Sequence, residues 1–358
     1  MRSKAMVLTA PERMELQEFE LRPTPVDHVL VKTSVTSVCS TDLKVFRGKT
    51  PFVNYPLVMG HEVAGEVVEI GSAAKHWYPF EAGDRITIEP YIACGRCRHC
   101  RSDHFYHHCT SGGIYGISLS CGQPPHLFGG YSDYFYLVPG AIAHKQNEQM
   151  LDSAASISSV VANGVRWVKT LAQVGFGDSV VISGPGSQGL CSLAAALHSG
   201  ADPVIVLGLD CDAARLQLAL EFGAHCVINV DQEDPVNLFG SMLPEGADVV
   251  IETSGTPSAI QAAIQMVKRG GKIINIGLSG GVETTIAFDD LVWKSVSLIS
   301  GLGQAGNVAD AMKLISSGRF AFEKINSHTY KLEELAKALR DTEERPSGFI
   351  KGAIVFDG

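Results

Sequence analysis

Residues Ser179-Val-Val-Ile-Ser183 run directly into Gly184-Pro-Gly-Ser-Gln-Gly189, and helix-forming residues follow at once. A G-x-G-x-x-G string placed between a strand and a helix is typical of a dinucleotide-binding turn. The first glycine permits the tight turn, the second lets the backbone approach a pyrophosphate, and the third lets the helix pack on the sheet. An ordinary glycine-rich turn is the alternative. The residues that we predict to bind the cofactor phosphates are Gly184, Pro185, Gly186, Ser187, Gln188 and Gly189.

After about Asp152, short apolar runs alternate with helix-length amphipathic segments. The predicted strands are Ser179–Ser183, Val204–Leu209, Cys226–Val230, Asp248–Glu252, Lys272–Ile276 and Ser297–Ser300. The predicted helices between them include Leu190–Ser199, Ala213–Phe222 and Ala259–Val267. Six β units joined by helical crossovers predict an α/β fold with a doubly wound parallel sheet, the Rossmann arrangement.

The residues before this region have a different pattern. Short β-rich runs separated by Gly/Pro turns, such as Val63–Ile70 and Arg85–Ile88, predict a mostly antiparallel β domain. The tail is expected to be helical over Leu332–Thr342 and then extended over Gly348–Val355, where it could pair with the first domain. We therefore expect residues 1–158 and 302–358 to form one domain and residues 159–301 to form the other.

Composition excludes several classes of protein. The chain has 358 residues, 38 acidic against 29 basic, and a net charge of -9, which argues against nucleic acid as the main partner. We find no signal-peptide pattern at the start and no apolar run of about 18 residues, so we expect a soluble cytoplasmic protein without a membrane partner. Nine cysteines are an odd number, and four of them crowd into positions 94–109, which favours metal binding over disulfides.

The end of the second predicted strand bears on the choice of dinucleotide. Asp210 follows the glycine turn by about 20 residues, where a carboxylate can hold the ribose hydroxyls of NAD. Two observations leave NADP as an alternative cofactor. Gly208 can occupy the usual position of that carboxylate, and Arg215 is near enough to contact the 2′-phosphate of NADP. Asp210 could also simply cap the helix that starts at Ala213. We expect NAD, with NADP as the alternative.

The four crowded cysteines have metal-ligand spacing. Cys94-Gly-Arg-Cys97-Arg-His-Cys100, followed by Cys109, offers four thiolates in a glycine-containing loop. Closed coordination by four cysteines is the usual structural zinc arrangement. His108 could replace Cys109 as the fourth ligand. We predict a structural zinc ion here.

A second set of metal-ligating residues is dispersed along the chain. Cys39 follows a predicted strand, and His61 with Glu62 opens the next one. A thiolate, an imidazole and a carboxylate can form a zinc site with one position left open for catalysis. From the residues alone, however, a small buried cysteine and a hydrogen-bonded loop histidine are the favoured interpretation.

Taken together, these motifs resemble the zinc-dependent medium-chain dehydrogenase/reductase superfamily, in particular its sorbitol and threonine dehydrogenase-like branch. The matching motifs, in order, are Cys39-x-Thr41-Asp42, Gly60-His61-Glu62-x-x-Gly65, Gly83-Asp84-Arg85, the four-cysteine loop and Gly184–Gly189. The resemblance implies a GroES-like β domain and a Rossmann domain, with zinc and the nicotinamide meeting in the cleft between them. It also implies a homodimer or homotetramer.

The resemblance assigns residues to roles. Cys39, His61 and Glu62 become catalytic zinc ligands, and Thr41 becomes the hydroxyl that passes on the substrate's proton. Lys44 stands where many relatives have a relay histidine. Contacts with the cofactor are implied for Lys351 at the diphosphate and for Thr253, Ile276 and Leu278 at the nicotinamide end.

The chain also departs from the family pattern. Ser159 stands where relatives often have a zinc-site Glu or Cys, so Glu62 or water must complete the shell. The interval from Cys100 to Cys109 is one residue longer than usual.

The expected reaction is hydride transfer between an alcohol and NAD(P), giving a ketone or aldehyde, with zinc activating the alcohol oxygen. Polyols, amino alcohols and bulky secondary alcohols all remain open as substrates, although the loss of a carboxylate at Ser159 disfavours small polyols. The alternatives are a zinc-independent NADPH reductase of the same superfamily and a non-catalytic nucleotide-binding protein.

Overall fold

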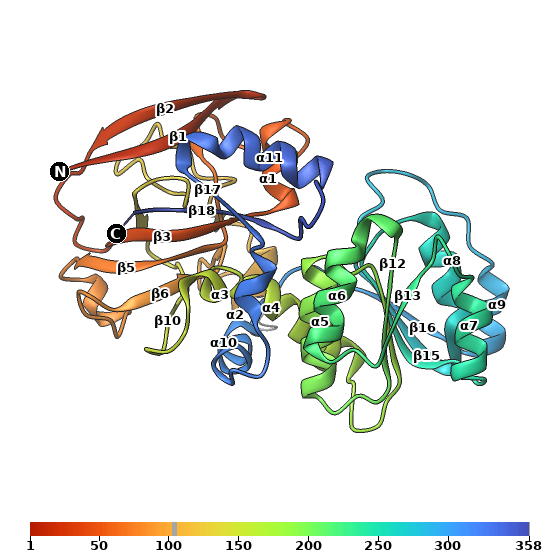
Figure 1. Ribbon diagram of the computed structural model, residues 1–358. Helices are drawn as coiled ribbons and strands as arrows, with labels where there is room; N and C mark the ends of the chain where they lie inside the picture. The colour runs from red at the N-terminus through yellow and green to blue at the C-terminus, as the bar shows by residue number, and fades with distance from the viewer. Residues whose placement is uncertain (102–105, 358) are drawn as a thin grey trace. The chain divides into compact units, whose positions relative to one another are not determined.

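The protein is described by a computed structural model for residues 1–101 and 106–357, which divides into two compact units (Figure 1). Unit 1 comprises Met1–Ser159 and Ile315–Gly358, and unit 2 comprises Val160–Leu314. Residues 302–314 thus belong to unit 2, although we assigned them to the first domain from the sequence. They are held there by side chains, since Lys169 Nζ lies 2.7 Å from Asp310 Oδ2 and Thr170 Oγ1 lies 3.0 Å from Asn307 Oδ1.

Unit 1 is built on a seven-stranded sheet in which β3 is central. The order is β10-β6-β5-β3-β18-β17, with β9 also pairing with β3. These strands are β3 (Val29–Val38), β5 (Val63–Ile70), β6 (Arg85–Ile88), β9 (Tyr134–Leu137), β10 (Ala143–Lys145), β17 (His328–Tyr330) and β18 (Gly352–Val355). The C-terminal strand β18 pairs antiparallel with β3, which confirms the predicted return of the tail to the first domain.

Two smaller sheets complete the β structure of unit 1. One has the order β2-β1-β4 and consists of β1 (Arg2–Ala10), β2 (Arg13–Glu20) and β4 (Leu57–Val58). The other pairs β7 (Tyr91–Ile92) with β8 (Gly113–Ile114). Aliphatic and aromatic side chains from the sheets of unit 1 fill two buried clusters.

Short helices connect and cover these sheets. They are α1 (Ser40–Phe46), η1 (Ala74–His76), α2 (Arg98–Arg101), η2 (Tyr106–His108), α3 (Asp152–Ser156), η5 (Phe322–Ile325), η6 (Leu332–Glu334) and α11 (Leu335–Glu344). The predicted tail helix is therefore a 3-10 turn that continues into α11. Helix α4 (Ser158–Val165) begins in unit 1 and ends in unit 2.

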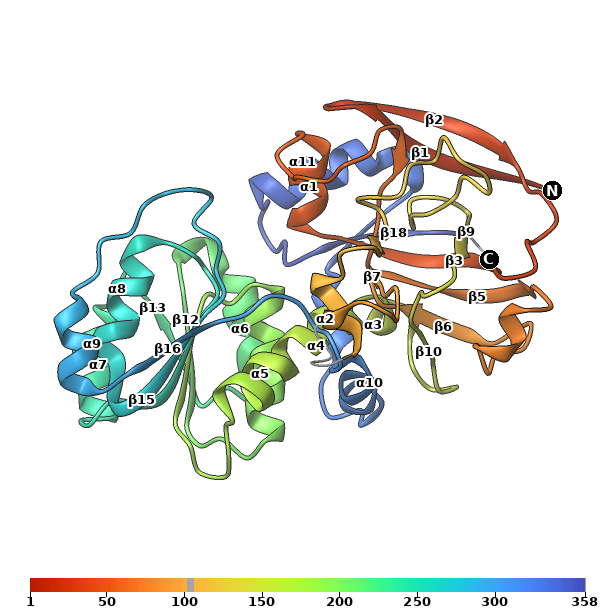
Figure 2. The ribbon, with the colours of Figure 1, turned by 180° about the vertical axis from the view of Figure 1, so that it is seen from behind.

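Unit 2 has a parallel sheet with the strand order β13-β12-β11-β14-β15-β16. Figure 2 shows helices of unit 2 packed around this sheet. The strands are β11 (Val180–Ser183), β12 (Val204–Gly208), β13 (Cys226–Asn229), β14 (Ala247–Glu252), β15 (Val267–Asn275) and β16 (Ser297–Ser300). The helical segments are η3 (Arg166–Ala172), α5 (Ser187–His198), η4 (Asp210–Asp212), α6 (Ala213–Phe222), α7 (Pro235–Met242), α8 (Pro257–Met266), α9 (Phe288–Lys294) and α10 (Val308–Ser316). This order runs outward from β11 in both directions, so the predicted doubly wound α/β sheet is confirmed.

The central strands of unit 2 are apolar because both faces of the sheet are covered. Val180, Val181 and Ile182 of β11 are fully buried, as expected for a parallel strand between helical layers. Within residues 1–101 and 106–357, none of the helices combines the length and the apolar character that crossing a membrane requires.

Candidate active site

Two neighbouring strands of unit 1 bring Cys39, His61 and Glu62 together. Cys39 directly follows β3 and is the N-cap residue of α1, while Glu62 directly precedes β5. Strands β3 and β5 are antiparallel, so the end of one lies beside the start of the other. The potential ligand atoms of Cys39, His61 and Glu62 all lie within 4.8 Å of one another, and His61 and Glu62 are buried.

A buried carboxylate lies behind these residues. Asp42 is completely buried; its Oδ1 lies 3.2 Å from His61 Nδ1, and its Oδ2 accepts hydrogen bonds from the Cys39 amide and the Tyr131 hydroxyl, each at 2.9 Å. Burial raises the pKa of the Asp42 carboxyl, but the neighbouring His61 and the hydrogen bonds from Cys39 and Tyr131 together outweigh it, so the pKa is lowered. The pKa of His61 is likewise raised well above its usual value, because Asp42 outweighs the effect of burial.

The sequence analysis gave no role to Asp42 or Tyr131. Asp42 belongs to a quoted motif, but nothing local identifies its partner. Tyr131 lies 89 residues further along the chain. Only the folded sheet brings the two together.

Glu62 faces a second buried group, Lys351. The Lys351 ammonium lies 2.9 Å from Glu62 Oε2 and donates a hydrogen bond of 3.0 Å to the Val38 carbonyl. Burial would lower the pKa of Lys351, but the Glu62 charge outweighs it and raises the pKa. Within unit 1 the charge of Lys351 is paired with Glu62, and its expected contact with the cofactor diphosphate stays a prediction.

The donor set of this site fits zinc. Zinc prefers cysteine, histidine and carboxylate ligands, and all three are present. Glu62 Oε2 faces the Lys351 ammonium, but the carboxylate still offers a ligand atom within 4.8 Å of the donor atoms of Cys39 and His61. Ser159, the residue that replaces an acid or thiol in this chain, is buried in the first turn of α4.

Helix α1 also carries the two residues expected to move protons. Thr41 is half-buried, two residues after Cys39, and Lys44 is exposed. Positions three apart lie on the same face of a helix. Thr41 and Lys44 therefore lie along one side of α1, Thr41 in the first turn after Cys39 and Lys44 exposed to solvent.

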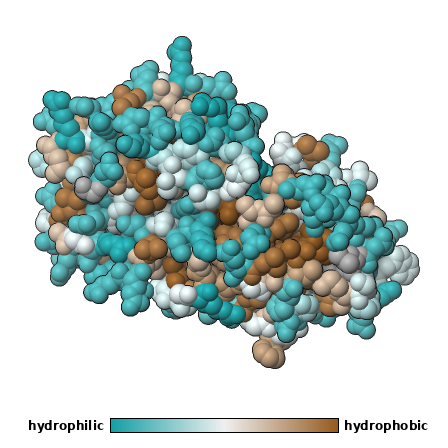
Figure 3. Space-filling view, in the orientation of Figure 1, coloured by the Kyte–Doolittle hydropathy of each residue, from teal (hydrophilic) through white to brown (hydrophobic). Residues whose placement is uncertain are grey.

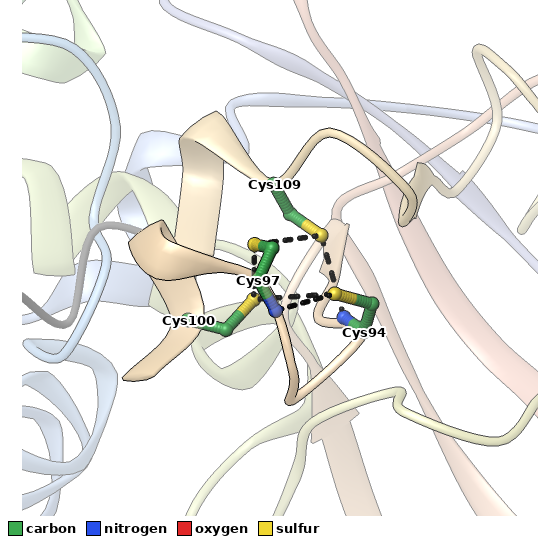
Figure 4. Close-up of side chains that lie close together, drawn as sticks. All are labelled: Cys94, Cys97, Cys100 and Cys109. Carbon is green, nitrogen blue, oxygen red and sulfur yellow. Dashed lines mark hydrogen bonds between the residues drawn. The ribbon is translucent and has the colours of Figure 1, made fainter. Parts of the chain in front are cut away.

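The four-cysteine loop forms a compact thiol cluster (Figure 4). The Sγ atoms of Cys97 and Cys100 are 3.5 Å apart, and those of Cys97 and Cys109 are 3.9 Å apart. All four Sγ atoms lie within 4.8 Å of one another, so Cys109 is the fourth member of the group. The interval from Cys100 to Cys109, which is one residue longer than usual, includes residues 102–105, and these lie outside the described residues.

The electrostatics of this cluster also fit a divalent cation. Hydrogen bonds from the backbone amides of Arg96 and Cys97 lower the pKa of Cys94 to about 6. Burial and the neighbouring thiols raise the pKa of Cys100 to about 12. Four thiolates this close repel one another, and a zinc ion is the usual group that offsets this repulsion.

In unit 2, the glycine turn has the geometry of an anion-binding helix start. Gly184 adopts a φ of +98°, which L side chains rarely reach, and Gly186 is the N-cap residue of α5. Ser187, Gln188 and Gly189 form the first turn of α5, three residues earlier than the predicted helix. Thr253 Oγ1 donates to the carbonyls of Ser183 and Gly184, each at 2.9 Å, and so fixes the turn. The free amides of such a turn bind phosphate.

The end of β12 presents a fixed carboxylate. Asp210 Oδ1 accepts hydrogen bonds of 2.6 Å from both Asn229 Nδ2 and Gln232 Nε2. A Cβ on Gly208 would lie 2.9 Å from Pro185 Cγ, so there is little room for an acidic side chain at that position. Arg215, considered above for a 2′-phosphate, is buried and pairs with Asp212 at 2.6 Å.

The nicotinamide-end candidates lie beyond β14 and β15. Ile276 directly follows β15 and donates its amide hydrogen to the Glu252 carbonyl at 3.0 Å, whereas Leu278 is 72% exposed. The sequence analysis missed Glu252, a fully buried carboxylate that accepts hydrogen bonds from the amides of Ser254 and Gly255. The sequence offered one indication of this residue: Glu252 is the last residue of the predicted strand Asp248–Glu252.

Comparison with known proteins identifies the family. Residues 25–147 match the family described as "Alcohol dehydrogenase GroES-like domain", and residues 189–317 match "Zinc-binding dehydrogenase". A Mycobacterium tuberculosis protein described as "Probable alcohol dehydrogenase adh" is 32% identical over 92% of this chain and 91% of that protein. The chain belongs to the zinc-dependent medium-chain dehydrogenase superfamily.

Other members of this superfamily agree with the assignment. An L-threonine 3-dehydrogenase from Thermococcus kodakarensis is 33% identical over 88% of this chain and 87% of that protein. The crystal structure of an alcohol dehydrogenase from Thermotoga maritima superposes with a TM-score of 0.90 at 26% identity, covering 99% of both chains. As a zinc-dependent medium-chain dehydrogenase, this protein is an NAD(P)-dependent oxidoreductase of the alcohol dehydrogenase type, and the non-catalytic and zinc-independent alternatives are not supported.

Proposed function

We propose that this dehydrogenase oxidises a secondary alcohol to a ketone, and reduces the ketone in reverse, with zinc held by Cys39, His61 and Glu62. The convergence of these three side chains beside one buried carboxylate carries the proposal. A second zinc held by Cys94, Cys97, Cys100 and Cys109 would fix the loop that contains them.

Residues of this chain would carry away the proton that the alcohol loses. When bound, the zinc lowers the pKa of the alcohol oxygen, and the nicotinamide takes up the hydride. Thr41, half-buried and two residues from Cys39, accepts the proton that the alcohol loses and in the same step passes its own hydroxyl proton onward. Lys44 lies one helical turn further along α1 at an exposed position, where water can take up the proton. Asp42 holds His61 in one orientation throughout.

The substrate is best sought among bulky secondary alcohols and amino alcohols. Ser159 contributes no charge where an acid could hold the hydroxyls of a small polyol. The similarity to L-threonine 3-dehydrogenases supports including β-hydroxy amino acids.

We further propose that NAD is preferred over NADP. Asp210 is fixed by two amide donors, and Asp212 and Asp231 lie close to it in the fold, so a 2′-phosphate would enter an acidic environment. A structural relative described as a zinc-binding dehydrogenase from Sinorhizobium meliloti was solved with NADP; it has a TM-score of 0.89 and 25% identity, and it covers 99% of this chain and all of the other. The preference therefore needs a direct test.

Asp210→Ala should weaken NAD binding about tenfold, since charge-assisted hydrogen bonds contribute about 1.5–3 kcal/mol.

The oligomeric state is also a proposal. Strand β16 ends the sheet order of unit 2, and the segment around it is rich in exposed apolar side chains. These are Leu278, Val282, Phe288, Val292, Trp293, Leu298 and Leu302. Hydrophobic residues also gather over unit 2 on the face seen in Figure 3. A second copy could pair antiparallel with β16 and cover this surface by two-fold symmetry.

The oligomer proposal predicts a dimer or tetramer in solution. Leu298→Lys should reduce the molar mass measured by light scattering to that of a smaller species. Phe176→Lys, which changes another exposed apolar residue of unit 2, should leave the mass unchanged. A wild-type monomer would overturn the proposal.

The function is tested with a panel of secondary alcohols, β-hydroxy amino acids and polyols, each with NAD and NADP, read as absorbance of the reduced nicotinamide. We expect NADH formation with secondary alcohols, and loss of this activity in Cys39→Ser. If the protein holds both zinc ions and reduces neither cofactor with any of these alcohols, the proposal is wrong.

A further inference from the structure

A tyrosine hydroxyl lies behind the proposed catalytic metal site. Tyr131 is fully buried, and its hydroxyl donates to Asp42 Oδ2 at 2.9 Å. The same oxygen accepts the Cys39 amide at 2.9 Å, and the other carboxylate oxygen lies 3.2 Å from His61 Nδ1. One carboxylate thus touches both Cys39 and His61, and Tyr131 is the side-chain hydroxyl that fixes it.

The backbone around Tyr131 allows little movement. Its amide donates to the Met59 carbonyl at 3.0 Å, and its carbonyl accepts the Met6 amide at 2.9 Å. A Cβ on Gly60 would lie 3.1 Å from Tyr131 Cδ1, so the ring packs directly against the residue before His61. The hydroxyl is therefore presented to Asp42 from a rigid position.

We infer that Tyr131 is a positioning residue for the catalytic zinc: by fixing the rotamer of Asp42, it orients the His61 ring and the Cys39 backbone toward the ion. Without the hydroxyl, Asp42 Oδ2 keeps the Cys39 amide but loses its second donor. The carboxylate can then rotate, and His61 loses a fixed partner at Nδ1. Groups that orient metal-ligating histidines change metal affinity by about 10–100-fold when they are removed.

This inference rests on the proposed function, because it assumes zinc at Cys39, His61 and Glu62. The test compares Tyr131→Phe with Tyr115→Phe. Tyr115 is also fully buried in unit 1, accepts a hydrogen bond from the Val138 amide at 2.8 Å and donates one to the Tyr136 carbonyl at 3.2 Å. Both variants remove one buried hydroxyl and keep the ring.

The first measurement is the affinity of the exchangeable zinc, obtained by competition with a chromophoric chelator. Tyr131→Phe should bind this zinc about tenfold more weakly than wild type, while Tyr115→Phe should bind it normally. A second measurement replaces the exchangeable ion with Co²⁺, whose visible spectrum reports ligand geometry. The spectrum should change in Tyr131→Phe and remain that of wild type in Tyr115→Phe.

The outcomes separate the two proposals. If wild type holds no exchangeable zinc, the proposed function fails. If wild type holds it and Tyr131→Phe has the same affinity and Co²⁺ spectrum, the positioning role is wrong and the proposed function stands. Equal loss of affinity in both variants would also overturn the role, since general destabilisation would then explain the effect.

Discussion

Glu62 has two partners, and a single substitution cannot separate them. Its carboxylate lies within reach of Cys39 and His61 and also pairs with Lys351. Removing its charge leaves a buried cation unpaired, which costs about 3–5 kcal/mol. Loss of zinc from Glu62→Gln could therefore reflect either a lost ligand or a distorted site.

A paired substitution resolves this ambiguity. We predict that Glu62→Gln lowers the affinity for the exchangeable zinc by about 100-fold or more and also lowers the melting temperature. Adding Lys351→Met should restore much of the stability but not the zinc, because the unpaired charge is gone while the ligand is still missing. Zinc content and calorimetry are the measurements.

Ser159→Ala is the matched control for Glu62. It should keep zinc and should keep activity within about tenfold, which corresponds to about 1.4 kcal/mol. If Glu62→Gln keeps its metal and Ser159→Ala loses it, Glu62 is not a ligand.

At the scale of elements, one carboxylate joins three strands of unit 2. Asp248 of β14 accepts hydrogen bonds from the amide and hydroxyl of Ser179, which precedes β11, at 2.9 and 2.6 Å. It also pairs with Lys268 of β15. Burial favours a higher pKa for Asp248, but the bonds from Lys268 and Ser179 outweigh it, so the pKa is lowered.

This shift gives a pH dependence. A lowered folded-state pKa means that the stabilisation is complete above the unfolded pKa of about 3.9 and is lost as the pH falls through the lower folded value. At neutral pH, Asp248→Asn should reduce the free energy of unfolding by about 1–2 kcal/mol in urea titrations. The difference from wild type should shrink below about pH 4. An unchanged difference at pH 3 would show that the charge of Asp248 is not responsible.

The four-cysteine loop is the element that should depend most on metal. It has few apolar residues of its own, and its four side chains repel one another as thiolates unless a cation lies between them. We predict that Cys97→Ser lowers the folding yield and melting temperature, because metal binding there supplies folding free energy. Cys211→Ser, at an exposed cysteine outside the cluster, should change neither. An unchanged melting temperature for Cys97→Ser would argue against a structural site.

For the whole molecule, two ligand groups predict two zinc ions per chain with different exchange rates. A closed four-thiolate site releases its ion slowly, whereas a site with an open position exchanges faster. Gentle chelation should remove one ion together with activity and leave the other. Elemental analysis alongside the activity assay measures this, and a single zinc in fully active protein would contradict it.

The sequence predicted those parts of the fold that depend on neighbours in the chain. The parallel strands of unit 2 are short apolar runs at regular intervals, and the four cysteines have local metal-ligand spacing. The start of α5 was misplaced because the glycine motif was treated as a turn, whereas Gly186 already caps the helix. Such errors concern boundaries and leave the topology intact.

Contacts between distant residues could not be predicted from local patterns. The Glu62–Lys351 pair joins residues at opposite ends of the chain, and Tyr131 meets Asp42 only because β1, β3 and the segment before β5 come together. Cys39 and His61 were different: the family resemblance supplied an assignment that their residue types alone did not favour.

The placement of β18 has a consequence for biosynthesis. This strand lies between β3 and β17, yet its residues are translated more than 300 positions after the end of β3. At about 5–20 residues per second, a ribosome needs about 15–60 s to cover that distance. Unit 2 is continuous in sequence and is complete before β18 emerges. The part of β3 that pairs with β18, Val35–Val38, therefore waits with one edge unpaired and open to pairing with another chain until the last residues of the protein close the sheet.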